Sequence, residues 1–95
     1  MIRFEWNPAK STINLRKHGV DFGEAKSVFY DEFARVTDDI DHSNAEDRFV
    51  ILGMSDVLRI LIVCHCYRKD ADIIRIISAR KATSGERRAY QQHKP

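Results

Sequence analysis

The sequence predicts an α+β domain in which two helices near the N-terminus pack on an antiparallel β-sheet and a C-terminal helix follows. Two runs rich in β-branched and aromatic residues, 48–54 and 59–67, are separated only by a short polar turn. Residue patterns that cap helix N-termini precede these runs. A further strand, 73–81, leads directly into another such capping pattern. Strands and helices grouped in runs are typical of α+β proteins. Because 95 residues suffice for one modest core, we expect a single domain, 1–95.

The composition is that of an ordinary globular protein. Hydrophobic residues make up 43% of the chain and charged residues 32%. No stretch approaches the roughly 20 apolar residues of a membrane-spanning helix. Residues 1–20 carry several charged side chains where a secretory signal would be apolar. We therefore expect a cytoplasmic protein that does not contact a membrane.

The net charge of +2 is unevenly distributed along the chain. Residues 1–47 hold six Lys/Arg against ten Asp/Glu, whereas residues 48–95 hold ten Lys/Arg against four Asp/Glu. Such an asymmetry suggests an anionic partner for the second half, and nucleic acid is the commonest one.

The N-terminal segment alternates apolar and charged residues over 2–6, which predicts a short half-buried strand. Asn7 is a favoured N-cap and Pro8 suits the first position of a helix. This helix should run to Lys17 or His18 and stop at Gly19, a residue that adopts the left-handed conformation easily. Its apolar face is thin and consists of Ala9, Ile13 and Leu15.

A second helix is predicted to begin by a similar capping device. Asp21 would cap it, Glu24 would close a capping box, and Val20 would pack on Ala25 as a hydrophobic staple. The helix should end near residue 30 or 31. The residues that share its apolar face at helical spacing are Phe22, Ala25, Val28 and Phe29.

The sheet is predicted mainly from the second half of the chain. A strand over 33–37 precedes a polar loop, 38–47, that contains five acidic residues and no Lys or Arg. The runs 48–54 and 59–67 should form a hairpin across residues 55–57. A second charged turn, 68–72, then leads into the last strand.

That last strand begins with a dense isoleucine run and becomes cationic toward its end. Strict alternation would place Arg75 and Lys81 on one face with Ile77 and Ala79. It would place Ser78 and Arg80 on the other face, with Ile74 and Ile76. The strand end should therefore be basic on both faces.

Thr83 and Glu86 have the spacing of a capping box, which predicts a helix over 84–92. A junction of a strand and a helix start that carries arginines suits a phosphate group, because arginine offers a planar fork of donors.

The cysteines and histidines define no metal site. Cys64 and Cys66 lie two residues apart in a strand, too far for an unstrained disulfide, and are expected to be core thiols. His65 would point to the opposite face, and for it a core role and a functional role are equally compatible with the pattern. His42 lies in the acidic loop near Asp39, Asp41 and Glu46, at a spacing that matches no metal motif.

His18 stands directly before a helix-ending glycine. A histidine at that position is more often present because its charge or ring suits the helix C-terminus. The sequence pattern therefore favours a structural role for His18 over that of a catalytic base.

Cleavage of RNA without a metal needs a group that takes the proton of the 2′-hydroxyl, a group that stabilises the phosphate charge and a group that protonates the leaving oxygen. His65, His42 and Glu46 could exchange protons. The residues that could hold the phosphate are Arg48, Arg68, Arg75 and Arg80. Composition does not choose among them.

Three ordered blocks of the sequence match one protein family. FEWNPAKSTINLRKHGVDFGEAKSVFYD near the start, EDRFVILG in the middle and RIISARKATSGERRAY near the end resemble the BrnT toxins of bacterial type II toxin–antitoxin modules. The similarity extends from Phe4 to Tyr90. In one small departure, Asn7 stands where the family commonly has Asp, and either residue caps a helix.

The resemblance implies a RelE-like ribonuclease fold and inhibition of translation by cleavage of RNA, most simply mRNA, with no cofactor or metal. It also implies neutralisation by a BrnA-type antitoxin with a ribbon-helix-helix DNA-binding domain, in a heterotetramer that represses its own operon. DNA would be contacted only through the antitoxin.

The family motif covers Arg75, Ser78, Arg80 and the pair Glu86–Arg87, and it also matches Lys17 and His18. We expect Arg80 and Arg48 to hold the phosphate and His65 and Glu46 to exchange protons. The residues expected to bind RNA around them are Arg68, Arg75, Lys81 and Arg87.

Two other functions are compatible with the sequence. A non-catalytic basic module that binds nucleic acid or an acidic peptide would explain the charge without an unambiguous acid–base pair. A DNA-binding regulator fits less well, because no helix carries Arg, Asn and Gln at the spacing that reads a DNA groove.

Overall fold

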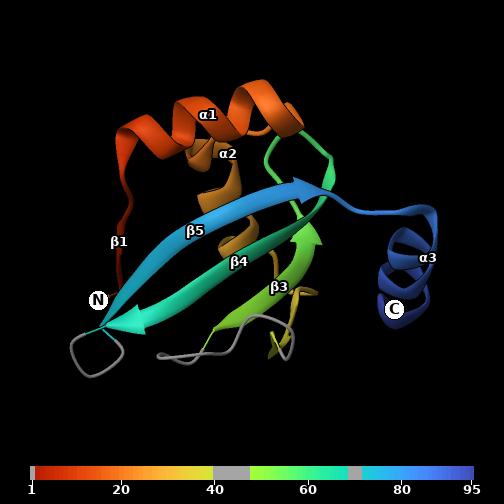
Figure 1. Ribbon diagram of the computed structural model, residues 1–95. Coiled ribbons are helices and arrows are strands. Elements are labelled where there is room, and N and C mark those ends of the chain that lie inside the picture. Colours follow the sequence, from red (N-terminus) through yellow and green to blue (C-terminus); the bar gives the residue numbers. More distant parts are fainter. Residues whose placement is uncertain (1, 40–47, 69–71) are drawn as a thin grey trace.

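The computed structural model describes residues 2–39, 48–68 and 72–95. Within these residues the chain forms one five-stranded sheet with helices on both of its faces (Figure 1). The elements in chain order are β1 (Arg3–Glu5), α1 (Pro8–His18), α2 (Phe22–Ser27), the 3₁₀ helix η1 (Val28–Tyr30), β2 (Arg35–Asp38), β3 (Phe49–Met54), β4 (Ile60–Arg68), β5 (Ile73–Lys81) and α3 (Ser84–His93).

The sheet is mixed, with strand order β1-β5-β4-β3-β2. Strands β2 to β5 pair antiparallel as predicted, but β1 pairs with β5 in parallel, Arg3 opposite Ile73 and Glu5 opposite Arg75. The prediction of an all-antiparallel sheet is therefore wrong at this edge. The physical reason is that β1 reaches β5 through the whole intervening fold, so no tight turn forces the two strands to run in opposite directions.

The main core lies between the sheet and the N-terminal helices. Phe22, Ala25 and Val28 pack against Ile51, Leu61, Val63, Ile76 and Ala79 of the sheet, as the predicted apolar face requires. A smaller cluster forms where Tyr90 of α3 packs with Ile60 and Ala82. Because Ile60 and Leu61 are neighbours in a strand, their side chains point to opposite faces. Helix α3 therefore covers one end of the face that α1 and α2 leave open.

A β-bulge at Ile77 changes which residues of β5 share a face. Cys64 pairs with Ser78 and His65 with Ile76, so that Ile77 has no opposite residue in β4. Ile76 and Ala79, three residues apart, are consequently both buried in the helix-covered core. The prediction that Ser78 and Arg80 share a face with Ile74 and Ile76 is wrong, because the extra residue turns them toward the open face.

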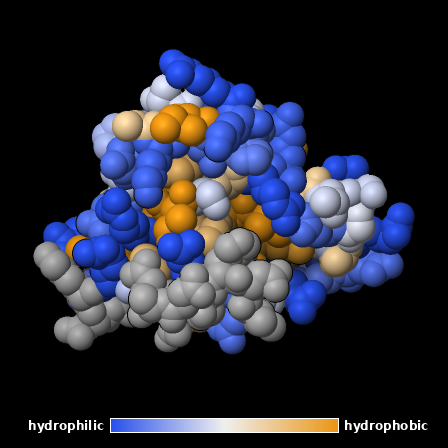
Figure 2. Space-filling view, viewed as in Figure 1, coloured by the Kyte–Doolittle hydropathy of each residue, from blue (hydrophilic) through white to orange (hydrophobic). Residues whose placement is uncertain are grey.

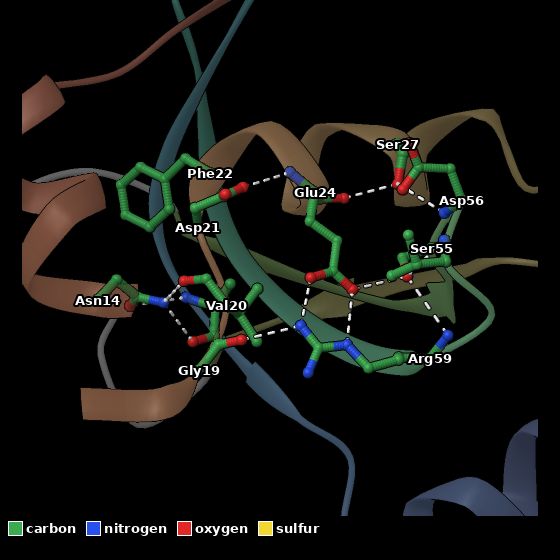
Figure 3. Close-up of polar contacts among 12 residues, drawn as sticks. Asn14, Gly19, Val20, Asp21, Phe22, Glu24, Ser27, Ser55, Asp56 and Arg59 are labelled. Atoms are coloured by element: carbon green, nitrogen blue, oxygen red, sulfur yellow. Dashed lines mark hydrogen bonds and ion pairs between the residues drawn. The ribbon is translucent and has the colours of Figure 1, made fainter. Parts of the chain in front are cut away.

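The helix caps follow the sequence closely. Asn7 Oδ1 accepts from Ala9 N and Lys10 N, and Gly19 closes α1 with a φ of 72°. Thr83 and Glu86 form the predicted capping box at the start of α3. Asp21 caps α2 by accepting from Glu24 N, but the Glu24 carboxylate turns to Arg59 and Ser55 instead of closing a box (Figure 3).

Helix α1 contacts the sheet through a polar residue. Ala9, Ile13 and Leu15 are exposed, so the predicted apolar face is wrong, and the buried residue of this helix is Asn14. Its Nδ2 donates to Val20 O at 2.7 Å and Ala79 O at 2.8 Å, and its Oδ1 accepts from Ala79 N at 3.2 Å (Figure 3). The pairing of β1 with β5 covers only Ile73–Arg75, and farther along this edge the Asn14 amide bonds the backbone N–H and C=O of Ala79.

An ion pair joins the N-terminal helices to the β3–β4 hairpin. Arg59 Nε donates to Glu24 Oε2 at 2.9 Å, and its Nη2 donates to Glu24 Oε1 and to Gly19 O. The Arg59 guanidinium is the main cause of a lowered pKa at Glu24. This contact fixes the C-terminal end of α1 and the start of α2 relative to the sheet. None of the helices in the described part of the chain is long and apolar enough to span a bilayer.

Candidate active site

The open face of the sheet carries a pocket of about 270 Å³ beside the last turn of α1. We call it the arginine pocket, because Arg48 and Arg80 both line it. Figure 2 shows apolar surface exposed below α1 and bordered by hydrophilic side chains. The other described residues that line the pocket are His18, Asp39, Val50, Ile62, Cys64, Ser78 and Ala79.

Arg80 is held in place by the first turn of α3. Its Nη1 and Nη2 donate to the two carboxylate oxygens of Glu86 at 2.7 and 3.0 Å, as a planar fork. Glu86 Oε1 also accepts from Thr83 N at 2.8 Å, so the capping box orients the carboxylate that orients the arginine. Because a guanidinium has five N–H donors, Arg80 keeps donors for a second anion, and 45% of its side chain is exposed.

The Arg80–Glu86 pair makes a testable contribution to stability at low pH. The hydrogen bonds from Arg80 lower the pKa of Glu86 to about 2. Since the folded-state pKa is depressed, this stabilisation is present above the unfolded pKa and is lost as pH falls toward 2. We expect the free energy of unfolding of the wild type to fall more steeply than that of Glu86→Gln below about pH 4.5, by less than about 1 kcal/mol because the pair is partly exposed.

Urea unfolding of both proteins at pH 6, 4 and 3 measures this difference. Glu32→Gln, which removes an exposed carboxylate outside this pair, serves as the matched control. Parallel pH dependence in the wild type and Glu86→Gln would contradict the assigned pairing.

Cys64 and Asp39 form the wall of the pocket next to Arg48. Cys64 Sγ donates to Asp39 Oδ2 at 3.4 Å, and Asp39 N donates to Arg48 O at 2.9 Å. Burial, and then the hydrogen bond to Asp39, raises the pKa of the Cys64 thiol to about 11. The thiol is therefore protonated at neutral pH and does not act as a nucleophile there. Cys64 lines the pocket instead of lying in the core, whereas Cys66 is buried as predicted.

His65 lies on the other side of the sheet from the arginine pocket. Its ring is fully buried, with Phe29 at 4.8 Å, Tyr67 at 5.3 Å and Phe49 at 6.1 Å between ring centroids. Its Nδ1 lies 3.2 Å from Val63 O, and burial lowers its pKa. The structure therefore brings Arg48 and Arg80 together but does not bring His65 to them.

The other predicted site residues that the structure describes do not line the arginine pocket. Arg68 and Arg75 lie at the far end of β4 and β5, where Glu5 pairs with both at 3.2 and 3.3 Å. Lys81 lies on the helix-covered side near Gly19, and Arg87 donates to Ala82 O, just before α3. Glu46 and His42 fall outside the described residues.

His18 is the pocket residue that the sequence argument assigned to structure. It stands in the last turn of α1, and the attachment of this helix to the edge of β5 brings it to the pocket. The sequence signal for it was its place in the Lys17–His18–Gly19 block of the family motif. Among the residues that the structure describes, no group of three or more His, Cys, Asp or Glu side chains is placed to hold a metal ion.

The fold and the pocket define a small α+β protein in which two arginines line one pocket on the open face of its sheet. A family model described as "Ribonuclease toxin, BrnT, of type II toxin-antitoxin system" matches residues 6–86. The chain therefore belongs to the BrnT family of ribonuclease toxins of type II toxin–antitoxin systems.

A solved structure supports the fold. The crystal structure of the Brucella abortus ribonuclease toxin BrnT superposes with a TM-score of 0.67 at 24% sequence identity. The match covers 88% of this chain and 100% of that one. At this level of identity the likeness shows the α+β fold and nothing finer. A comparison with functionally curated proteins finds no match.

Proposed function

We propose that this protein is a RelE-like endoribonuclease that cleaves RNA, most simply mRNA, without a metal ion and so inhibits translation in the cytoplasm. The observation that carries the proposal is the convergence of Arg48 and Arg80 on one pocket, although they are 32 positions apart in the sequence. Two guanidinium groups can supply the positive charge that a metal ion supplies in other nucleases.

The pocket favours binding of a single phosphodiester group. Arginine forks match phosphate oxygens geometrically, and Arg80 keeps N–H donors beyond those that bond Glu86 and Lys81 O. The half-buried side chains of Val50 and Ile62 line the floor of the pocket, and such apolar surface lowers the local dielectric and strengthens the attraction. Negative charge that develops on the phosphate during attack by the 2′-oxygen would be stabilised there.

Regulation follows from the family. A toxin of a type II system has a protein antitoxin, and we propose a BrnA-type partner with a ribbon-helix-helix domain. The expected complex is a heterotetramer that represses its own operon, with DNA contacted only by the antitoxin. An antitoxin that covers the arginine pocket would block cleavage directly.

Incubation of the purified protein with an mRNA transcript, once in excess EDTA and once in Mg²⁺, tests the proposal. We expect the same cleavage pattern under both conditions, with fragments ending in 2′,3′-cyclic phosphate. Retarded but uncut RNA would favour the alternative, a non-catalytic binding module. Cleavage only with Mg²⁺ would contradict the metal-independent mechanism.

A further inference from the structure

We infer that His18 is the general base that accepts the proton of the attacking 2′-hydroxyl in the arginine pocket. The inference rests on the proposed ribonuclease activity and assigns its missing proton acceptor. His18 takes the proton-exchanging role that the sequence suggested for His65, which the sheet separates from the pocket.

The backbone of His18 is fixed although its side chain is exposed. Hydrogen bonds of its neighbours hold this backbone in place. Gly19 N donates to Leu15 O at 2.9 Å, and Asn14 forms hydrogen bonds with the edge of β5. Arg59 Nη2 donates to Gly19 O at 2.8 Å and connects this turn to the β3–β4 hairpin as well. A residue held by both the sheet and the hairpin can present an imidazole to the pocket at a defined position.

The chemistry of the other pocket residues leaves few alternatives. The guanidinium groups of Arg48 and Arg80 stay protonated, and the Cys64 thiol has its pKa raised to about 11. Histidine is the side chain that ordinarily exchanges a proton between pH 5 and 8. Of the described residues that line the pocket, Asp39 is the one other possible base, and it already accepts the hydrogen bond of Cys64.

The pocket is the right size for one ribose-phosphate unit. Taken as a sphere, its 270 Å³ corresponds to a diameter of about 8 Å, so a group on one wall can reach a hydroxyl whose phosphate is bound at another.

In the proposed step, a neutral His18 ring nitrogen takes the 2′-hydroxyl proton as the 2′-oxygen bonds to phosphorus. The bond from phosphorus to the 5′-oxygen then breaks, and this oxygen keeps the electron pair and takes a proton from water. The products are a 2′,3′-cyclic phosphate and a 5′-hydroxyl, and His18 returns its proton to solvent.

Charged side chains from several neighbouring elements lie around this histidine. Arg16 and Lys17 precede it on α1. Lys81 lies close to Gly19, and Arg59 reaches the same glycine from the turn that precedes β4. The described titratable or charged residues that line the pocket with it are Asp39, Arg48, Cys64 and Arg80.

The test measures single-turnover cleavage of one RNA oligonucleotide that contains a mapped cut site, from pH 5 to 9. The proteins compared are the wild type, His18→Gln, Asp39→Asn and the control His93→Gln. Affinity is measured separately with the 2′-O-methyl form of the oligonucleotide, which lacks the nucleophile. His18→Gln is expected to lose 10²- to 10⁴-fold in rate, the usual contribution of a general base, with about the same affinity for the uncleavable RNA. His18→Ala should regain part of its rate in added imidazole.

The wild-type rate should rise with pH across the range in which histidines titrate, and His18→Gln should lose that rise while Asp39→Asn and His93→Gln keep it. Loss of the rise in Asp39→Asn alone, or an unchanged rate in His18→Gln with the wild type active, would overturn the assignment to His18 but leave the ribonuclease standing. An inactive wild type would overturn the ribonuclease itself and, with it, the role of His18.

Discussion

Replacement of Arg80 by alanine is expected to reduce RNA cleavage by about 10²- to 10³-fold, the usual effect of removing one donor to a developing oxyanion. Arg80 combines a position in the pocket with a guanidinium oriented by two hydrogen bonds to Glu86. The cleavage rate of Arg80→Lys should lie between those of the wild type and Arg80→Ala, because lysine keeps the charge but cannot form the fork. Single-turnover rates on the mapped oligonucleotide measure the effect, and growth after induced expression should follow it.

Arg88→Ala is the matched control, since Arg88 is an exposed arginine of α3 that does not line the arginine pocket. It removes the same charge from the chain and should leave the rate nearly unchanged. The Arg80 variant should still fold, because partly exposed ion pairs contribute only about 0–1 kcal/mol. Equal cleavage by Arg80→Ala and the wild type at matched concentration would refute the role given to Arg80.

Those features of the fold that depend on residues three or four apart could be predicted from the sequence. The caps at Asn7, Asp21 and Thr83 are examples, since each uses a side chain and a backbone group within one helical turn. The bulge at Ile77 could not be predicted in this way. Isoleucine pairs on both sides of Arg75 show no alternation, so nothing local marks the residue at which the two faces exchange.

Of the residues that line the candidate pocket, the sequence singled out the two arginines as candidates but assigned His18 a structural role. Arg48 and Arg80 were recognisable because cationic side chains at strand ends stand out from the apolar runs beside them. For His65, alternation placed it correctly with Leu61 and Val63, but local sequence does not say which face the helices will cover. His18 reaches the pocket through a contact of Asn14 with Ala79, 65 positions away, which no local pattern contains.

Replacement of Asn14 by alanine is expected to be the most destabilising single change in α1. The side chain is 6% exposed, and its loss would leave Ala79 N, Ala79 O and Val20 O without their partner. An unsatisfied buried polar group costs about 1–3 kcal/mol, so we expect a loss of about 3 kcal/mol or more in the free energy of unfolding. Urea unfolding at pH 7 measures it, with Ile13→Ala on the exposed side as the control, expected within about 0.5 kcal/mol of the wild type.

Asn14→Asp separates the hydrogen bonds from the volume of the side chain. Aspartate can still accept from Ala79 N, but when ionised it cannot donate to Val20 O or Ala79 O and lies against both carbonyls. Its folded-state pKa should therefore be raised, so that stability relative to the wild type is regained below the unfolded pKa of about 3.9 and is lost as pH rises through the folded value. If Asn14→Ala cost no more than Ile13→Ala, or if the deficit of Asn14→Asp did not shrink in acid, the amide would not be what attaches α1 to the edge of β5. The position of His18 would then need another explanation, because that attachment is what carries the last turn of α1 to the pocket.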